Sequence, residues 1–107
     1  MRRGRPKKAR IILKEPEIRQ FSPRGRRGRP DYVTLTLDQF EAVRFSDLAR
    51  VSQKEAARQM NISQQTFSRI LNSARRTLAE ALAEGKIIRI SPEDTALTKE
   101  DRPAIKL

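Results

Sequence analysis

Polar side chains recur along residues 64–76 at the spacing of one face of a helix. Glutamine can form two hydrogen bonds with adenine, and arginine can form two with guanine, so these residue types are suited to reading base edges. No acidic residue occurs between Gln64 and Glu80. In a chain with this many charged residues, a helix face that is merely exposed to solvent would more often carry both acidic and basic residues. For each residue taken singly, plain exposure to solvent is the alternative. The candidate base contacts are Gln64, Gln65, Ser68, Arg69 and Asn72.

Basic and hydroxyl side chains beside this face are suited to phosphate. Serine and threonine near a helix N-terminus can donate to phosphate, helped by the backbone N–H groups there. Basic residues of the preceding helix would grip the flanking backbone, and two arginines further along the chain would reach it too. The candidate phosphate contacts are Lys54, Arg58, Ser63, Thr66, Arg75 and Arg76.

The helix that must carry most of these residues is predicted over residues 64–84, with Gly85 just past its end as a stop signal. The face opposite the polar residues is apolar at helical spacing, which predicts that this side is buried. The residues expected on the buried side are Phe67, Ile70, Leu71, Ala74, Leu78 and Ala81.

A second helix is predicted to begin after Ser52 and to end at a turn over residues 61–63. Ser52 and Glu55 have the spacing of a capping box. Asn61 tolerates the left-handed conformation that such a turn needs. The spacing over residues 53–70 matches the helix-turn-helix template, whose second helix enters the major groove of DNA. A helical hairpin in an ordinary three-helix domain is the alternative.

The flanking segments predict support for these two helices. A first helix is expected over residues 37–48, with Thr36 opening a capping box, and residues 32–35 have an extended pattern. Residues 86–90 are a strand candidate that could pair with residues 10–13. The expected fold class is therefore all-α, a small helical domain with a possible short two-stranded β element.

Most of the net positive charge lies in the first thirty residues. Residues 1–30 hold twelve Lys or Arg and two Glu, whereas residues 31–107 hold twelve basic and eleven acidic residues. Such a basic arm suits a polyanion, and its three prolines before residue 24 and few apolar residues disfavour a helix on a membrane surface. The expected organisation is a flexible basic arm over residues 1–31, a helix-turn-helix DNA-binding domain over 32–90 and a flexible tail over 91–107.

Two Arg-Gly-Arg-Pro cores, at residues 3–6 and 27–30, resemble the AT-hook motif. Arginine favours the narrow minor groove of A·T-rich DNA, glycine lets the backbone approach the groove, and proline keeps the segment extended. A basic tail that touches phosphates only is the alternative. The candidate arm contacts are Arg2, Arg3, Gly4, Arg5, Lys7, Lys8, Arg26, Arg27, Gly28 and Arg29.

The composition argues against an enzyme and against a metal or cofactor site. The chain has no cysteine and no histidine, so it lacks thiolate and imidazole ligands and the commonest general base. No acidic pair lies in an apolar setting that would tune it for acid–base chemistry. No apolar run approaches the length of a membrane span or a signal peptide, so a soluble and cytoplasmic protein is expected. If it binds DNA, it is expected to be associated with the nucleoid.

Several linked motifs carry a family resemblance over residues 1–90. The marks, in chain order, are RPKK, LTLDQFEAVRFSDL, SQKEAARQMNIS, TFSRILNSAR and GKIIRI. They resemble a family of small prokaryotic proteins of uncharacterised function that are predicted to bind DNA, and residues 35–82 look like region 4 of sigma-70-type factors. The resemblance implies a helix-turn-helix of that kind and a role in transcriptional regulation. Two departures are Asn61, where the family commonly has glycine, and residues 24–32, which are shorter and richer in arginine than in relatives.

The leading hypothesis is a transcriptional regulator that binds double-stranded DNA. One alternative is a protein-interaction module that engages RNA polymerase, as sigma region 4 does. Another is RNA binding through the arm, disfavoured because the predicted helix face lacks the exposed aromatic residues on which single strands stack. Leu78 and Leu82 could make a homodimer contact, or they could pack on the helix expected over residues 37–48.

Overall fold

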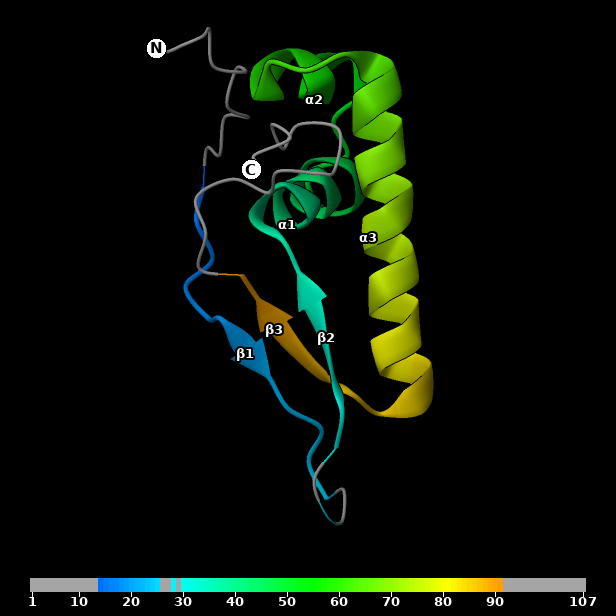
Figure 1. The fold of residues 1–107 in the computed structure, drawn as a ribbon. Helices are drawn as coiled ribbons and strands as arrows, with labels where there is room; N and C mark the ends of the chain where they lie inside the picture. Colours follow the sequence, from blue (N-terminus) through cyan, green and yellow to red (C-terminus); the bar gives the residue numbers. More distant parts are fainter. Residues whose placement is uncertain (1–13, 26–27, 29, 92–107) are drawn as a thin grey trace, which may run out of the picture.

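The computed structural model describes residues 14–25, 28 and 30–91. Figure 1 shows a long helix along one side of the molecule, with the shorter helices beside its N-terminal half and a small sheet beside its C-terminal half. The elements of the described residues, in chain order, are β1 (Gln20–Phe21), β2 (Tyr32–Leu35), α1 (Leu37–Val43), the π-helical η1 (Arg44–Leu48), α2 (Gln53–Met60), α3 (Gln64–Glu84) and β3 (Ile87–Ile90).

The sheet has three strands in the order β1-β3-β2, with β3 antiparallel to β1 and parallel to β2. The expected two-stranded element is therefore a mixed three-stranded sheet, and the described fold is mostly helical rather than all-α. The extended segment predicted at residues 32–35 is strand β2, and the strand candidate at residues 86–90 is confirmed as β3 from Ile87 onward. The partner predicted for the second of them, residues 10–13, lies outside the described residues. β1 and β2 occupy both edges of β3, and the three helices between β2 and β3 provide the long crossover that a parallel pair requires.

The apolar face of α3 joins the two halves of the core, as its spacing predicts. Phe67, Ile70 and Leu71 are buried against α1, η1 and α2, in a cluster that includes Phe45 and Met60. Further along, the helix contributes to a second cluster that closes on the sheet. That second cluster comprises Leu35, Leu37, Ala74 and Ile90, with Leu78 half-buried against it. Since both clusters share α3, the core fixes the orientation of its exposed face.

Local capping signals account for the helix starts, with one correction. Ser63 Oγ accepts from Thr66 N–H at 3.0 Å at the start of α3, and Gln39 Oε1 accepts from Thr36 N–H at 2.9 Å at the start of α1. The capping box predicted for α2 forms only in half: Ser52 Oγ accepts from the backbone of Glu55 at 3.1 Å. The Glu55 carboxylate instead accepts hydrogen bonds from the side chains of Arg58 and Gln59, further along α2. A hydrogen bond from a charged donor such as Arg58 is stronger than one from a neutral backbone N–H.

The first predicted helix, residues 37–48, divides into two parts. Regular α-helix ends at Val43, and η1 continues it with a wider turn in which Ala49 N–H donates to Arg44 O at 2.8 Å. Phe45 is buried in the wider turn, whereas Leu48 is exposed at its end. The long helix matches its predicted bounds, and Gly85 follows it at φ 67°, a left-handed conformation that glycine adopts without steric cost.

The turn residue Asn61 provides a test of the geometry between α2 and α3. Its φ of 60° and ψ of 45° lie in the left-handed region, which costs most residues with a Cβ ~1–2 kcal/mol. We expect Asn61→Ala to lower the free energy of unfolding by about 1 kcal/mol and Asn61→Gly to leave it nearly unchanged. Urea denaturation followed by circular dichroism measures both. Equal stability of the two variants would show that the left-handed turn contributes nothing.

Candidate nucleic-acid interface

The connection from α2 to α3 determines how the N-terminal end of α3 is presented. Asn61 N–H donates to Arg58 O at 3.1 Å, and Ile62 N–H donates to Ala57 O at 3.0 Å. Ile62 packs on the core cluster that contains Phe67. These contacts satisfy carbonyls at the end of α2 and hold the turn against the core, so that α3 leaves it in one direction.

Four of the candidate base contacts, Gln65, Ser68, Arg69 and Asn72, lie on the side of α3 away from its buried face, and Gln64 is the first residue of the helix. Their side chains are exposed except for that of Ser68, which is half-buried. Since Phe67, Ile70 and Leu71 hold the other side of the helix in the core, the exposed side faces solvent over its first turns. We call Gln64, Gln65, Ser68, Arg69 and Asn72 the α3 stripe.

Two of the predicted phosphate contacts also form the N-cap of α3. Ser63 Oγ–H donates to Thr66 Oγ1 at 2.9 Å while Ser63 Oγ accepts from the Thr66 backbone. The hydroxyl hydrogen of Ser63 is thus used inside the protein. Thr66 only accepts in this pair, so its own hydroxyl hydrogen can be donated to a phosphate. The geometry therefore favours Thr66 over Ser63 as a side-chain donor at this end of the helix.

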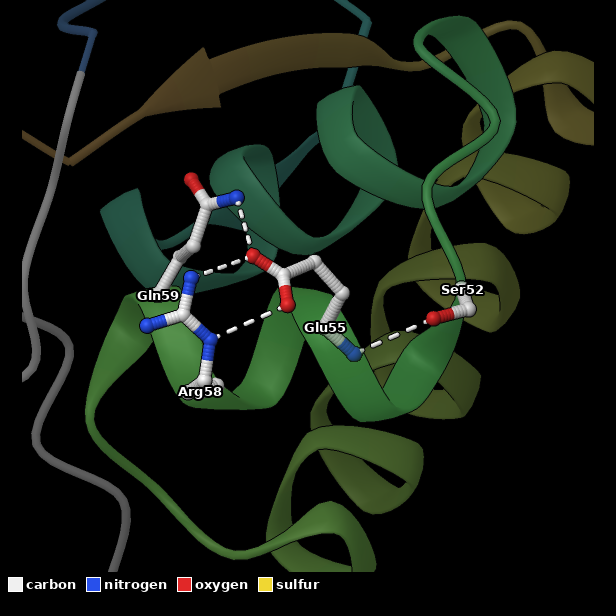
Figure 2. A network of polar contacts seen from close by, with 4 residues as sticks. All are labelled: Ser52, Glu55, Arg58 and Gln59. Carbon is white, nitrogen blue, oxygen red and sulfur yellow. Dashed lines mark hydrogen bonds and ion pairs between the residues drawn. The ribbon is translucent and has the colours of Figure 1, made fainter.

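Arg58, another predicted phosphate contact, is held by a carboxylate on its own helix. Figure 2 shows the network, in which Arg58 Nε and Nη2 donate to Glu55 at 3.0 and 2.5 Å and Gln59 Nε2 donates to Glu55 at 2.9 Å. The hydrogen bond from Arg58, followed by that from Gln59, lowers the pKa of Glu55 from its ordinary value of 4.5 to about 2. The charge of Arg58 is therefore balanced within α2, which weakens its attraction for a phosphate.

Arg75 is matched in the same way, but by a residue far away in the sequence. Arg75 Nη2 and Nε donate to Asp47 in η1 at 2.7 and 3.2 Å, and the hydrogen bond lowers the pKa of Asp47. The prediction overlooked this pair because no local signal links residues 28 positions apart. Lys54 and Arg76 are exposed and have no ion pair with the residues that the structure describes, so the described fold does not balance their charges.

The Glu55 network predicts a specific dependence of stability on pH. Because the folded-state pKa of Glu55 is depressed, the network stabilises the fold above the ordinary pKa of 4.5 and ceases to do so as the pH falls to about 2. We expect Glu55→Gln to flatten the fall in Tm between these two pH values. The control is Glu17→Gln, at an exposed position outside the network, which should retain the fall. Identical Tm profiles for Glu55→Gln and the unsubstituted protein would contradict the role given to the network.

The remaining predicted contacts belong to the basic arm. Gly28 is exposed at φ 76°, while Arg2, Arg3, Gly4, Arg5, Lys7, Lys8, Arg26, Arg27 and Arg29 lie outside the described residues. β1 falls within residues 1–31, so the segment predicted as an arm also contributes a strand to the sheet. Among the residues that the structure describes, no cluster of three or more acidic side chains could hold a metal ion, and no helix is long and apolar enough to cross a membrane.

Comparison with known proteins places the chain among relatives of similar sequence. The model of the family described as "Protein of unknown function DUF134" matches residues 1–97. A UPF0251 protein of Chlorobaculum tepidum is 42% identical over 100 residues, which cover 92% of this chain and 50% of that relative. A UPF0251 protein of Thermoanaerobacter pseudethanolicus is 40% identical over 99 residues, which cover 92% of this chain and 84% of that relative.

The relatives differ in length from this chain. A UPF0251 protein of Syntrophobacter fumaroxidans is 46% identical over 87 residues, which cover 80% of this chain and 56% of that protein. The chain thus spans about half the length of some of the curated relatives that it matches. No solved structure matches it.

Proposed function

We propose that this chain, which belongs to the family described as "Protein of unknown function DUF134", binds double-stranded DNA with α2 and α3 as a helix-turn-helix. In this proposal α3 enters the major groove, and the α3 stripe contacts base edges near its N-terminal end. The resemblance of residues 35–82 to region 4 of sigma-70-type factors implies a helix-turn-helix of the same kind.

The observation that carries the proposal is the contrast between the two sides of α3. One side is fully buried at Phe67 and Leu71, and the other exposes Gln65, Arg69 and Asn72. The exposed side chains combine donors and acceptors that suit base edges, and no acidic residue lies among them to repel phosphate. A helix of 21 residues is long enough to reach into the groove while its C-terminal half remains packed on the sheet.

The proposed phosphate contacts are basic residues that no described acidic residue balances. Lys54 on α2 and Arg76 on α3 supply positive charge near the stripe, and Thr66 supplies a hydroxyl donor at the helix N-terminus. Residues 1–30, with a net charge of +10 from twelve basic and two acidic residues, supply further affinity without sequence readout. Sequence-specific binding of this kind fits a regulator of transcription that is associated with the nucleoid.

Selection of bound duplexes from a random DNA library at near-physiological salt tests the proposal. We expect a recurrent motif, and its symmetry would report whether the protein binds as a dimer. Recovery of bound duplexes without any motif would contradict sequence-specific recognition. Failure to recover duplexes above background would contradict DNA binding altogether.

Substitution of Arg69 tests the orientation of α3 once a motif is known. We expect Arg69→Ala to cost ~1–3 kcal/mol of binding free energy and to relax the preference at one base position. Lys54→Ala removes the same charge from a predicted phosphate contact, so it should weaken binding equally on all sequences. Fluorescence anisotropy with duplexes altered at single positions distinguishes the two. A uniform loss for Arg69→Ala would assign Arg69 to phosphate instead.

A further inference from the structure

The face of the sheet that carries Gln20, Thr34 and Arg89 forms a polar surface distinct from the α3 stripe. Arg89 on the central strand is the registered partner of Gln20 on β1 and of Thr34 on β2, so the three side chains lie in one row across the sheet. All three are exposed, as is Tyr32, which precedes Thr34 on the same face of β2. In Figure 1 this sheet lies beside the C-terminal half of α3, away from the end that carries the stripe.

An arginine and a tyrosine stack on this face. The guanidinium carbon of Arg89 lies 3.9 Å from the centroid of the Tyr32 ring. A planar cation over an aromatic ring is attracted by the ring's charge distribution, which holds the flexible arginine side chain in place. Tyr32 remains 51% exposed in spite of this contact. The pair therefore presents a flat, positively charged surface to solvent.

The stacked pair lies within an open hollow of the surface. The hollow has a volume of about 630 Å³, and none of the described residues that line it is acidic. Arg19 at its edge donates to Ser91 O at 2.9 Å and to Glu15 at 2.9 Å, so that its position is fixed and its charge is partly balanced. The side chains used in the argument below are Arg19, Gln20, Tyr32, Thr34 and Arg89.

We propose that this face of the sheet binds single-stranded nucleic acid. An unpaired base would stack on the Tyr32–Arg89 pair, Gln20 and Thr34 would donate and accept hydrogen bonds at its edge, and the arginines would attract the adjoining phosphates. The bases inside a duplex cover one another and are not available for this stacking. RNA and single-stranded DNA share the chemistry that the face would recognise. This binding is separate from the duplex recognition proposed for α3 and does not depend on it.

Intrinsic fluorescence gives a direct test on the full-length chain, because Tyr32 is its only tyrosine and it has no tryptophan. Unlabelled twelve-nucleotide RNA and DNA strands of one mixed sequence are titrated while the tyrosine emission is recorded. Absorption by the oligonucleotide is corrected with free tyrosine amide. We expect saturable quenching by at least one of the single strands and none by the matched duplex. The comparison of the two titrations shows whether the face prefers RNA or single-stranded DNA.

Charge-conserving variants separate stacking from general attraction. Arg89→Lys keeps the positive charge but removes the planar group, so we expect single-strand affinity to fall ~10-fold in fluorescence anisotropy. Arg24→Lys is the matched control, since Arg24 is exposed and does not line the hollow. Arg69→Ala, which alters the α3 stripe, should leave the quenching by single strands unchanged.

Three results would overturn the inference. The first is an anisotropy change on addition of single strands without any quenching of Tyr32, which would assign their binding to another surface such as the arm. The second is quenching by the duplex at the same concentrations. The third is equal affinity of Arg89→Lys and Arg24→Lys for single strands. None of these results bears on the motif selected by duplex binding, so the failure of one proposal can be distinguished from that of the other.

Discussion

Removal of residues 1–13 is expected to make duplex binding far less sensitive to salt while the fold is retained. This segment holds six basic residues and no acidic residue. Each phosphate neutralised on duplex DNA contributes a slope of about −0.9 to log affinity against log salt, so six contacts contribute a slope of about −5. Six such contacts make the affinity for duplex DNA fall ~1,000-fold when the salt is raised from about 50 to 200 mM. The truncated protein should lack this part of the fall.

The structure determines where the chain can be cut. Lys14 N–H donates to Glu41 Oε2 at 3.2 Å, and β1 pairs with β3, so a deletion of all thirty residues of the basic segment would also remove part of the sheet. A cut after residue 13 leaves both contacts. The matched control is the full-length chain with the six basic residues of the segment replaced by glutamine. Parallel salt dependences for the truncated, glutamine-substituted and unsubstituted proteins would refute the role of these charges.

The second large effect is expected from Arg44→Met, at the junction of α1 and η1. Glu41 is fully buried, and Arg44 Nε donates to its Oε1 at 2.7 Å, a hydrogen bond that raises the pKa of Arg44. Replacement of the guanidinium removes a charged donor from a buried carboxylate, which we expect to cost about 3 kcal/mol. The Arg44 guanidinium carbon also lies 4.7 Å from the centroid of the Phe45 ring, so the substitution removes this cation–π contact together with the ion pair, while methionine fills much of the same volume.

Thermal and urea denaturation of Arg44→Met, Glu41→Gln and the double variant measure this pair. We expect the double variant to be more stable than the sum of the two single losses predicts, because the partners lose one shared interaction. Arg76→Met, which removes an exposed arginine from α3, is the control and should change the free energy of unfolding by less than about 0.5 kcal/mol. A loss for Arg44→Met no larger than that of the control would contradict the importance of the buried pair.

Several features of the fold could be predicted because their signals are local. The start of α3 follows from a serine whose side chain accepts from the backbone three residues later, and its end follows from a glycine that tolerates positive φ. Its buried face follows from apolar residues spaced three and four apart, all of which prove to be at least half-buried. The left-handed turn at Asn61 follows from the chemistry of one side chain.

The candidate interface is less fully predictable. The choice of stripe residues rests on one helix face, which sequence alone can locate. The ion pairs of the predicted phosphate contacts could not be located in this way. Arg75 pairs with Asp47, and the Glu55 side chain accepts from Arg58 instead of from the backbone at the start of α2. The first pair joins residues 28 positions apart, so no local pattern could indicate it. The second is a competition between two local partners, which the positive charge of the arginine decides.

By itself, the sequence determined the periods of the helices, their caps, the polar stripe and the uneven distribution of charge. These depend on residues within a few positions of one another or on composition alone. Only the tertiary structure decided that β1 and β2 flank β3, that Glu41 is buried beside Arg44, and that Arg89 stacks on Tyr32. Each of these requires distant segments to meet or a side chain to leave water. The free energy of such contacts depends on what the rest of the chain packs around them.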